Sequence, residues 1–161
     1  MSDLFTNDVH TPQMTTTTPG EVIIIRAAGT YEGKQGMSLA TGVSSRSAGA
    51  RALCLHGDDP ARQPWHTHIH DGHESAIYAV SGETEVWHGI GLRQRSVVKA
   101  GDFIYIPPGI PHLPVNRGDL TAAAVVARTD PHEQESVATL SLPPHLAELN
   151  AFPVASPGTP T

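Results

Sequence analysis

The stretch WHTHIHDGHE, residues 65–74, places four histidines and two acidic residues within ten positions. Histidine is the commonest metal ligand in proteins and also carries protons near neutral pH. In an extended strand, side chains alternate between faces, so His66, His68 and His70 would point the same way. Neighbouring rings on one face start roughly 7 Å apart and reach a shared ion through bonds of about 2 Å. The spacing therefore predicts a metal site that begins in this segment.

Two further residues are candidates to complete such a site. A bend at Asp71-Gly72 would return Glu74 to an ion held by His68 and His70. About forty residues further on, the segment GDFIYIPPGIPHLPVN, residues 101–116, places a histidine, His112, just after a Pro-Pro-Gly turn. The alternative is a solvent-facing strand whose histidines bind nothing. Two histidine-bearing elements together favour the metal site.

The two segments resemble the paired signatures of the cupin family, G-x5-H-x-H-x3,4-E-x6-G and G-x5-P-x-G-x2-H-x3-N. The second signature is matched at all of its named positions, which are Gly101, Pro107, Gly109, His112 and Asn116. Its glycines and proline shape the backbone, so we assign no chemistry to them.

The first signature is matched with two differences: no glycine stands six residues before His68, and one spacing is a residue longer. His68, His70 and Glu74 have the ligand spacing of the family, but seven residues rather than six separate Glu74 from Gly82. Counting back from Gly82 would instead place Ser75 at the acidic position. Serine is a poor ligand for such an ion, so we predict that Glu74 is the ligand.

The resemblance implies an all-β fold, a single-domain cupin barrel of the double-stranded β-helix or jelly-roll type. It implies one divalent transition metal ion, either iron, manganese, zinc or nickel, held on the inner face. The implied metal ligands are His68, His70, Glu74 and His112. Neutral imidazoles with one carboxylate suit a borderline divalent ion, and its remaining positions would stay open for water or substrate.

Other side chains near the predicted ion have less defined roles. His66 is expected to line the pocket mouth, to orient a ligand, or to act as a ligand itself if the register slips. His73 is expected either at the surface or behind the metal ligands. Alternation from Glu74 places Tyr78 on the inner face, so Glu74 and Tyr78 are the candidate catalytic residues for proton transfer. A core-filling role for Tyr78 is the alternative. In residues 103–106, either the two aromatic residues or the two isoleucines turn inward.

The function that these features favour is a metal-dependent enzyme acting on a small oxygenated organic molecule. Within that class we favour an oxidoreductase of the dioxygenase kind that uses iron or manganese. The alternatives are a zinc or nickel isomerase, a polyketide-cyclase-type cupin, and a non-catalytic barrel that binds a small ligand. A thiol dioxygenase fits less well, because those relatives generally use three histidines without the acid.

The elements that must position these residues are short strands. Apolar or alternating runs occur at residues 21–27 and then, about every ten residues, between residues 50 and 128. They are separated by Gly, Pro, Asp or Asn, which predicts an all-β sandwich or barrel. The segment PPHLAELN, residues 143–150, predicts a short helical turn near the C-terminus. We expect one domain over residues 21–150. Residues 1–20 and 151–161, rich in Thr, Ser, Pro and Gly, are expected to be flexible.

Composition excludes several classes of partner. The 161 residues include ten Lys and Arg against sixteen Asp and Glu, a formal charge of -6, and no basic block, so nucleic acid and anionic membranes are poor partners.

The single cysteine, Cys54, excludes an internal disulfide and fits a reducing compartment. Because the sequence has no secretory leader pattern and no long apolar span, we expect a cytoplasmic protein. The apolar segment EVIIIRA, residues 21–27, needs a cover, so we expect a homodimer.

Overall fold

The computed structural model describes residues 23–26, 29–48, 50–61, 66–132, 134 and 136–150. The two segments predicted to be flexible, residues 1–20 and 151–161, lie outside the described residues. Among the helices in the described ranges, none is long and apolar enough to cross a membrane.

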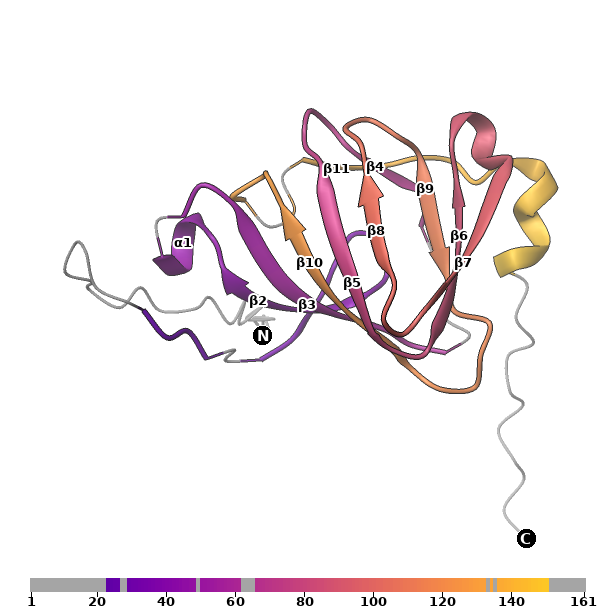
Figure 1. The fold of residues 1–161 in the computed structure, drawn as a ribbon. Helices are drawn as coiled ribbons and strands as arrows, with labels where there is room; N and C mark the ends of the chain where they lie inside the picture. The colour runs from indigo at the N-terminus through magenta and orange to yellow at the C-terminus, as the bar shows by residue number, and fades with distance from the viewer. Residues whose placement is uncertain are drawn as a thin grey trace, which may run out of the picture.

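Two antiparallel sheets form the domain and face each other across a shared interior (Figure 1). The first sheet has the order β1 (Tyr31–Glu32), β2 (Ser38–Val43), β3 (Leu53–Asp59), β10 (Ala122–Arg128), β5 (Ser75–Ser81) and β8 (Phe103–Ile106). The second has the order β11 (Val137–Thr139), β4 (His68–His70), β9 (His112–Val115), β6 (Glu83–His88) and β7 (Gln94–Lys99). The prediction of an all-β jelly-roll fold is confirmed.

The strands predicted between residues 50 and 128 are all present. The strand predicted at residues 21–27 is not seen where that segment is described: residues 23–26 form no strand, and Ile24 is 74% exposed. The expected homodimer was argued from an edge strand in this segment. Because residues 23–26 form no strand, the homodimer stays a prediction. Strands β1, β2 and β11 were not predicted, because short runs such as SLATGV and VAT hold few large apolar residues.

The helical segments are short. The predicted C-terminal turn is a 3-10 helix, Pro144–Asn150. In Figure 1 this yellow helix lies beside β6 and β7. Its leucines, Leu146 and Leu149, are buried against Leu113 and Val115 of β9. The remaining helical elements, α1 (Ser45–Ala48) and a 3-10 turn at Ile90–Leu92, connect strands.

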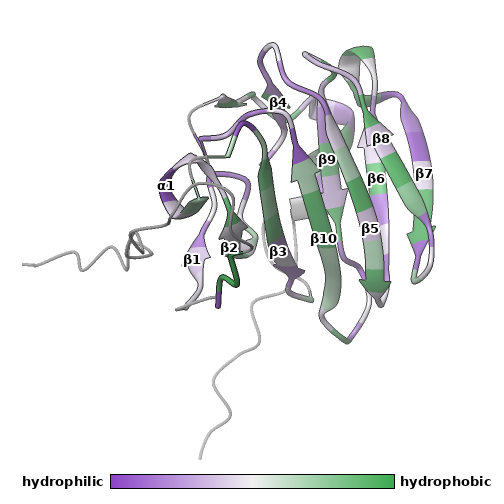
Figure 2. Ribbon diagram, turned by 60° about the vertical axis from the view of Figure 1, so that its left-hand side comes forward, coloured by the Kyte–Doolittle hydropathy of each residue, from purple (hydrophilic) through white to green (hydrophobic). Residues whose placement is uncertain are grey.

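The interior between the sheets is apolar. Strands β3, β10 and β5 carry long hydrophobic segments in Figure 2. The buried residues of the first sheet include Leu39, Leu53, Leu55 and Val126, which pack as one cluster. A second cluster joins Ala79 of β5 to Val86 and Val98 of the other sheet. These contacts fix the spacing of the two sheets and leave a cavity between them.

Candidate metal centre

Three histidines from two neighbouring strands converge on the inner face. His68 and His70 lie on β4, and His112 begins β9, where it is the direct cross-strand partner of His68. One ligand nitrogen from each ring lies within 4.8 Å of the other two. The ring centroids are 4.1 Å apart for His68 and His112, and the side chains are 3–4% exposed. The structure thus brings together three of the four predicted ligands.

Main-chain carbonyls set the orientation of two of these rings. Nδ1 of His68 donates to the carbonyl oxygen of His66 at 2.9 Å, and Nδ1 of His112 donates to that of Ile110 at 2.8 Å. Since a carbonyl oxygen can only accept, the proton resides on Nδ1 and the lone pair on Nε2 is left for a metal. Nδ1 of His70 is buried and has no hydrogen-bond partner within the described part of the chain. The donor set therefore fits a divalent metal ion.

The three rings are neutral at physiological pH. Burial lowers the pKa of His68 to about 3, of His70 to about 2 and of His112 to about 4. The positive charge of Arg128 lowers each pKa further. Imidazole binds a metal ion in its neutral form, so these nitrogens need not lose a proton at pH 7 before they coordinate.

The predicted fourth ligand, Glu74, is not in this group, which corrects the predicted ligand set. Its carboxylate accepts a 2.7 Å hydrogen bond from the hydroxyl of Tyr105. The turn through Gly72, at a φ of 69°, leads into β5 so that Ser75 rather than Glu74 faces the cavity. Ser75 is 2% exposed. The inward position is therefore the one obtained by counting back from Gly82.

The same one-residue difference overturns the prediction for Tyr78. Because successive side chains of a strand point to opposite faces, moving the inward position from Glu74 to Ser75 reverses every later residue of β5. Tyr78 is 40% exposed and its ring packs against Phe103, with centroids 4.8 Å apart. It does not line the cavity, so it is not a candidate catalytic residue. The residues of β8 that face inward are the isoleucines, Ile104 and Ile106.

The two other histidines of the cluster lie outside the centre. His66 is exposed, and it contributes its main-chain carbonyl to His68 rather than a ring nitrogen to the ion. His73 is partly buried, and its Nδ1 is 3.5 Å from the hydroxyl of Thr129. Neither ring belongs to the group of converging nitrogens.

A buried arginine beside the histidines was missed by the sequence analysis. Arg128 ends β10, is 5% exposed, and donates from Nε to the hydroxyl of Ser75 at 3.2 Å. Burial lowers the pKa of Arg128 to about 10, so the guanidinium stays charged at pH 7. The signal in the sequence was a charged residue at an inward position of the apolar run AAAVVAR. This charge lies at the histidine end of the cavity, where Asp130 interacts with it electrostatically.

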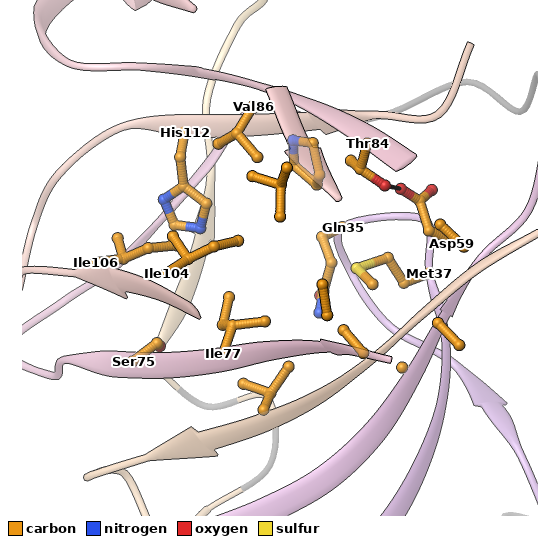
Figure 3. A pocket seen from close by; sticks show the side chains of 18 of the residues that line it. Gln35, Met37, Asp59, Ser75, Ile77, Thr84, Val86, Ile104, Ile106 and His112 are labelled. Atoms are coloured by element: carbon orange, nitrogen blue, oxygen red, sulfur yellow. Dashed lines mark hydrogen bonds between the residues drawn. The ribbon is translucent and has the colours of Figure 1, made fainter. Parts of the chain in front are cut away.

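The histidines form part of the wall of a cavity of about 100 Å³ between the sheets (Figure 3). Most of its lining is aliphatic, including Leu55, Ile77, Val86, Val98, Ile104 and Val126. Three polar residues, Gln35, Asp59 and Thr84, also line it, and in Figure 3 Asp59 and Thr84 lie apart from His112. A mostly apolar cavity with a few fixed polar groups is the usual form of a small-molecule site.

The buried Asp59 makes folding stability depend on pH. Burial raises its pKa from 3.8 to about 7, partly offset by a hydrogen bond from Thr84. Because the folded-state pKa is the higher one, the native state binds more protons, and its stability falls as pH rises through 7. In Asp59→Asn this loss is absent. We expect the difference in the free energy of unfolding, variant minus wild type, to increase by roughly 2 kcal/mol from pH 5 to pH 8.

Urea unfolding of both proteins across this range measures the effect. The histidines titrate in both proteins, so their contribution cancels in the difference. A difference that stays constant with pH would contradict the prediction.

Comparison with known proteins identifies the fold. A family model for the cupin domain matches residues 58–128. A cupin 2 conserved barrel domain protein from Salinispora arenicola is similar in structure, with a TM-score of 0.56 and 19% identity over 67% of this chain and 89% of that one. The polyketide cyclase RemF from Streptomyces resistomycificus has a TM-score of 0.56 and 21% identity over 83% of this chain and 92% of its own.

A third similar structure is a predicted oxalate decarboxylase from Thermotoga maritima, with a TM-score of 0.55 and 19% identity over 66% of this chain and 97% of that one. At these identities the likeness shows the shared fold. A search of the curated proteins gave no match.

Proposed function

Residues 58–128 form a cupin domain, and from this premise we propose that the protein is a metal-dependent enzyme acting on a small oxygenated organic molecule. The observation that carries the proposal is the convergence of His68, His70 and His112 in the wall of the apolar cavity. Three protein ligands leave positions open, which distinguishes a catalytic metal site from a closed structural one. A bound divalent ion supplies Lewis acidity toward an oxygen atom of the substrate.

The residues around the three histidines define what this end of the cavity binds. Arg128 brings a buried positive charge to the same end, and its guanidinium suits carboxylate or enolate oxygens. The aliphatic walls lower the local dielectric constant, which makes charge interactions in the cavity stronger than in water. The substrate that fits these features carries an acidic, oxygen-bearing group at the end that meets the histidines.

The reaction class that we favour is oxidation by molecular oxygen with iron or manganese, as in dioxygenases. The three-histidine set also favours a thiol dioxygenase as a second candidate, because the carboxylate that had counted against it is not part of the centre. A zinc or nickel isomerase or cyclase and a non-catalytic ligand-binding barrel are the remaining alternatives.

Metal reconstitution tests these candidates. Protein stripped of metal is loaded with iron, manganese, zinc or nickel in turn and mixed with enediols, diketones, phenols or small thiols, while oxygen uptake and product formation are followed. Oxygen uptake with iron or manganese is the expected result, and the substrate class separates the two dioxygenase candidates. Turnover without oxygen would favour an isomerase or cyclase, and ligand binding without product would favour a binding barrel. Failure to take up any of the four metals at micromolar concentration would overturn the proposal.

A further inference from the structure

We propose that the cavity contains a second recognition site, in which Asp59 accepts a hydrogen bond from a hydroxyl or ammonium group of the substrate. The inference rests on the proposed function and extends it to the other end of the same molecule. The substrate class that it names is a slender molecule with metal-binding oxygen at one end and a hydrogen-bond donor at the other.

Asp59 presents one unsatisfied oxygen at the cavity. The residue ends β3, lines the cavity and is 4% exposed. Its Oδ2 accepts a 2.9 Å hydrogen bond from the hydroxyl of Thr84, which lies on β6 of the opposite sheet. Its Oδ1 is buried and meets no donor among the residues described. Buried polar atoms are nearly always paired, so this oxygen is open to a donor from a ligand.

The position of Asp59 is fixed by its neighbours. Asn116 is fully buried and donates from Nδ2 to the main-chain carbonyls of Asp59 and Leu120, both at 2.8 Å. The Thr84 hydrogen bond then sets the plane of the Asp59 carboxyl group. Oδ1 of Asp59 is therefore preorganised, because hydrogen bonds hold both the main-chain carbonyl of the residue and its Oδ2. Preorganisation reduces the entropy lost when a ligand binds.

A second buried acceptor lies along the same cavity. Gln35 is 4% exposed and lines the cavity, and its Oε1 has no hydrogen-bond partner in the ranges that the structure covers. In Figure 3, Gln35 lies between His112 and the Asp59–Thr84 pair. Two unpaired acceptors in one apolar cavity favour a ligand that donates.

The two polar ends lie at different levels along β6. On β6, His88 is the cross-strand partner of His112, and Thr84 lies four residues earlier on the same strand. Four residues of strand span roughly 13 Å at about 3.3 Å per residue. Figure 3 likewise separates Asp59 and Thr84 from His112. A ligand that meets both ends is therefore extended, and its middle contacts aliphatic walls.

The alternative is that Asp59 only ties the two sheets together through Thr84. That role needs an acceptor for one hydroxyl, and a neutral amide would supply it without placing a carboxyl group in the interior. Burial raises the pKa of Asp59 to about 7, so the ionised form is held at a cost in stability. Such costs are typical of functional sites.

Hydroxamates with alkyl tails provide a direct test, since the hydroxamate group chelates divalent metals. Calorimetry on the full-length protein loaded with Zn²⁺ would compare tails of about four to eight carbons, chosen to span the distance estimated from the strand rise. The tails end in methyl, hydroxyl, ammonium or carboxylate. At one tail length, we expect the hydroxyl or the ammonium form to bind about tenfold more tightly than the methyl form. We expect the carboxylate form to bind more weakly, and comparing hydroxyl with ammonium identifies the donor.

Two variants assign the preference to Asp59. Asp59→Asn keeps an acceptor for Thr84 and turns an N–H group toward the cavity, so the preference for donor tails over the methyl tail should disappear. The matched control is Asp58→Asn, which removes the neighbouring carboxylate that lies 3.8 Å from His56, and should keep that preference.

The binding data distinguish failure of the Asp59 site from failure of the metal centre. Equal affinity for methyl and donor tails at every length, measured on the wild type alone, would overturn the Asp59 site and leave the metal centre in place. If no hydroxamate binds the zinc-loaded protein, the metal-dependent function fails and the Asp59 site fails with it.

Discussion

Replacing His112 with alanine is expected to abolish stoichiometric metal binding, whereas Glu74→Gln is expected to leave it intact. His112 contributes one of three converging nitrogens, and its lone pair is aimed by the hydrogen bond from Nδ1 to the Ile110 carbonyl. Removing one of three ligands should weaken affinity by at least about a hundredfold. Glu74 instead accepts a hydrogen bond from Tyr105. Elemental analysis after gel filtration, with a chelator competition, measures both variants.

The pair of variants distinguishes two ligand sets. If Glu74→Gln loses metal as fully as His112→Ala does, the four-ligand set implied by the family signature would hold and the three-histidine centre would be incorrect. His112→Gln serves as a second variant that fills most of the ring volume, so a loss of metal cannot be assigned to a cavity alone. The melting temperature of each apo-protein shows whether it is folded.

The second large effect is expected at Gly82, where the chain turns from β5 into β6. Its φ is 76°, a left-handed conformation, and an added Cβ would lie 2.7 Å from Cα of Ala122 on β10. Gly82→Ala therefore introduces both backbone strain and an overlap with a strand that cannot move aside. We expect it to lower the free energy of unfolding by at least about 3 kcal/mol.

Gly72 is the matched control for Gly82. It has a similar φ of 69°, but an added Cβ would meet nothing within 4 Å. Gly72→Ala should cost about 1 kcal/mol, the strain of the left-handed conformation alone. Urea denaturation gives both values, and equal losses would mean that the approach of Ala122 is not a constraint.

Sequence patterns located the strands and the histidines because both signals are local. Each strand between β3 and β10 is a short apolar or alternating run bounded by turn residues. The segment at residues 101–116 combines glycines, prolines and one histidine at the distances of the family signature, so His112 could be assigned through that resemblance. The two histidines of β4 follow from alternation within three residues.

The inward residues of β5 were mispredicted because their register is set by contacts that are distant in sequence. Pairing of β5 with β10 and β8, together with the close approach of Gly82 to Ala122, decides that Ser75 faces the cavity and Glu74 does not. Alternation counted from Glu74 contains no information on those partners. Gly82 was the better anchor for the count, because its own backbone position is constrained by β10.

Arg128 and Asp59 were missed for a related reason. Each stands at the end of an apolar strand, where a charged residue usually marks the start of a solvent-exposed turn. Only the pairing of β10 with β3 and β5 shows that both side chains point into the shared interior. Their partners, Ser75 and Thr84, are 53 and 25 residues away in sequence.

The main-chain origin of the hydrogen bonds to His68 and His112 has a consequence for how this protein can diversify. The accepting carbonyls belong to residues 66 and 110, whose side chains take no part in these bonds. Substitutions at either position can therefore reshape the loops without disturbing the tautomer of either imidazole. Natural variation can retune which molecules are admitted while the chemistry of the coordinating nitrogens is inherited unchanged.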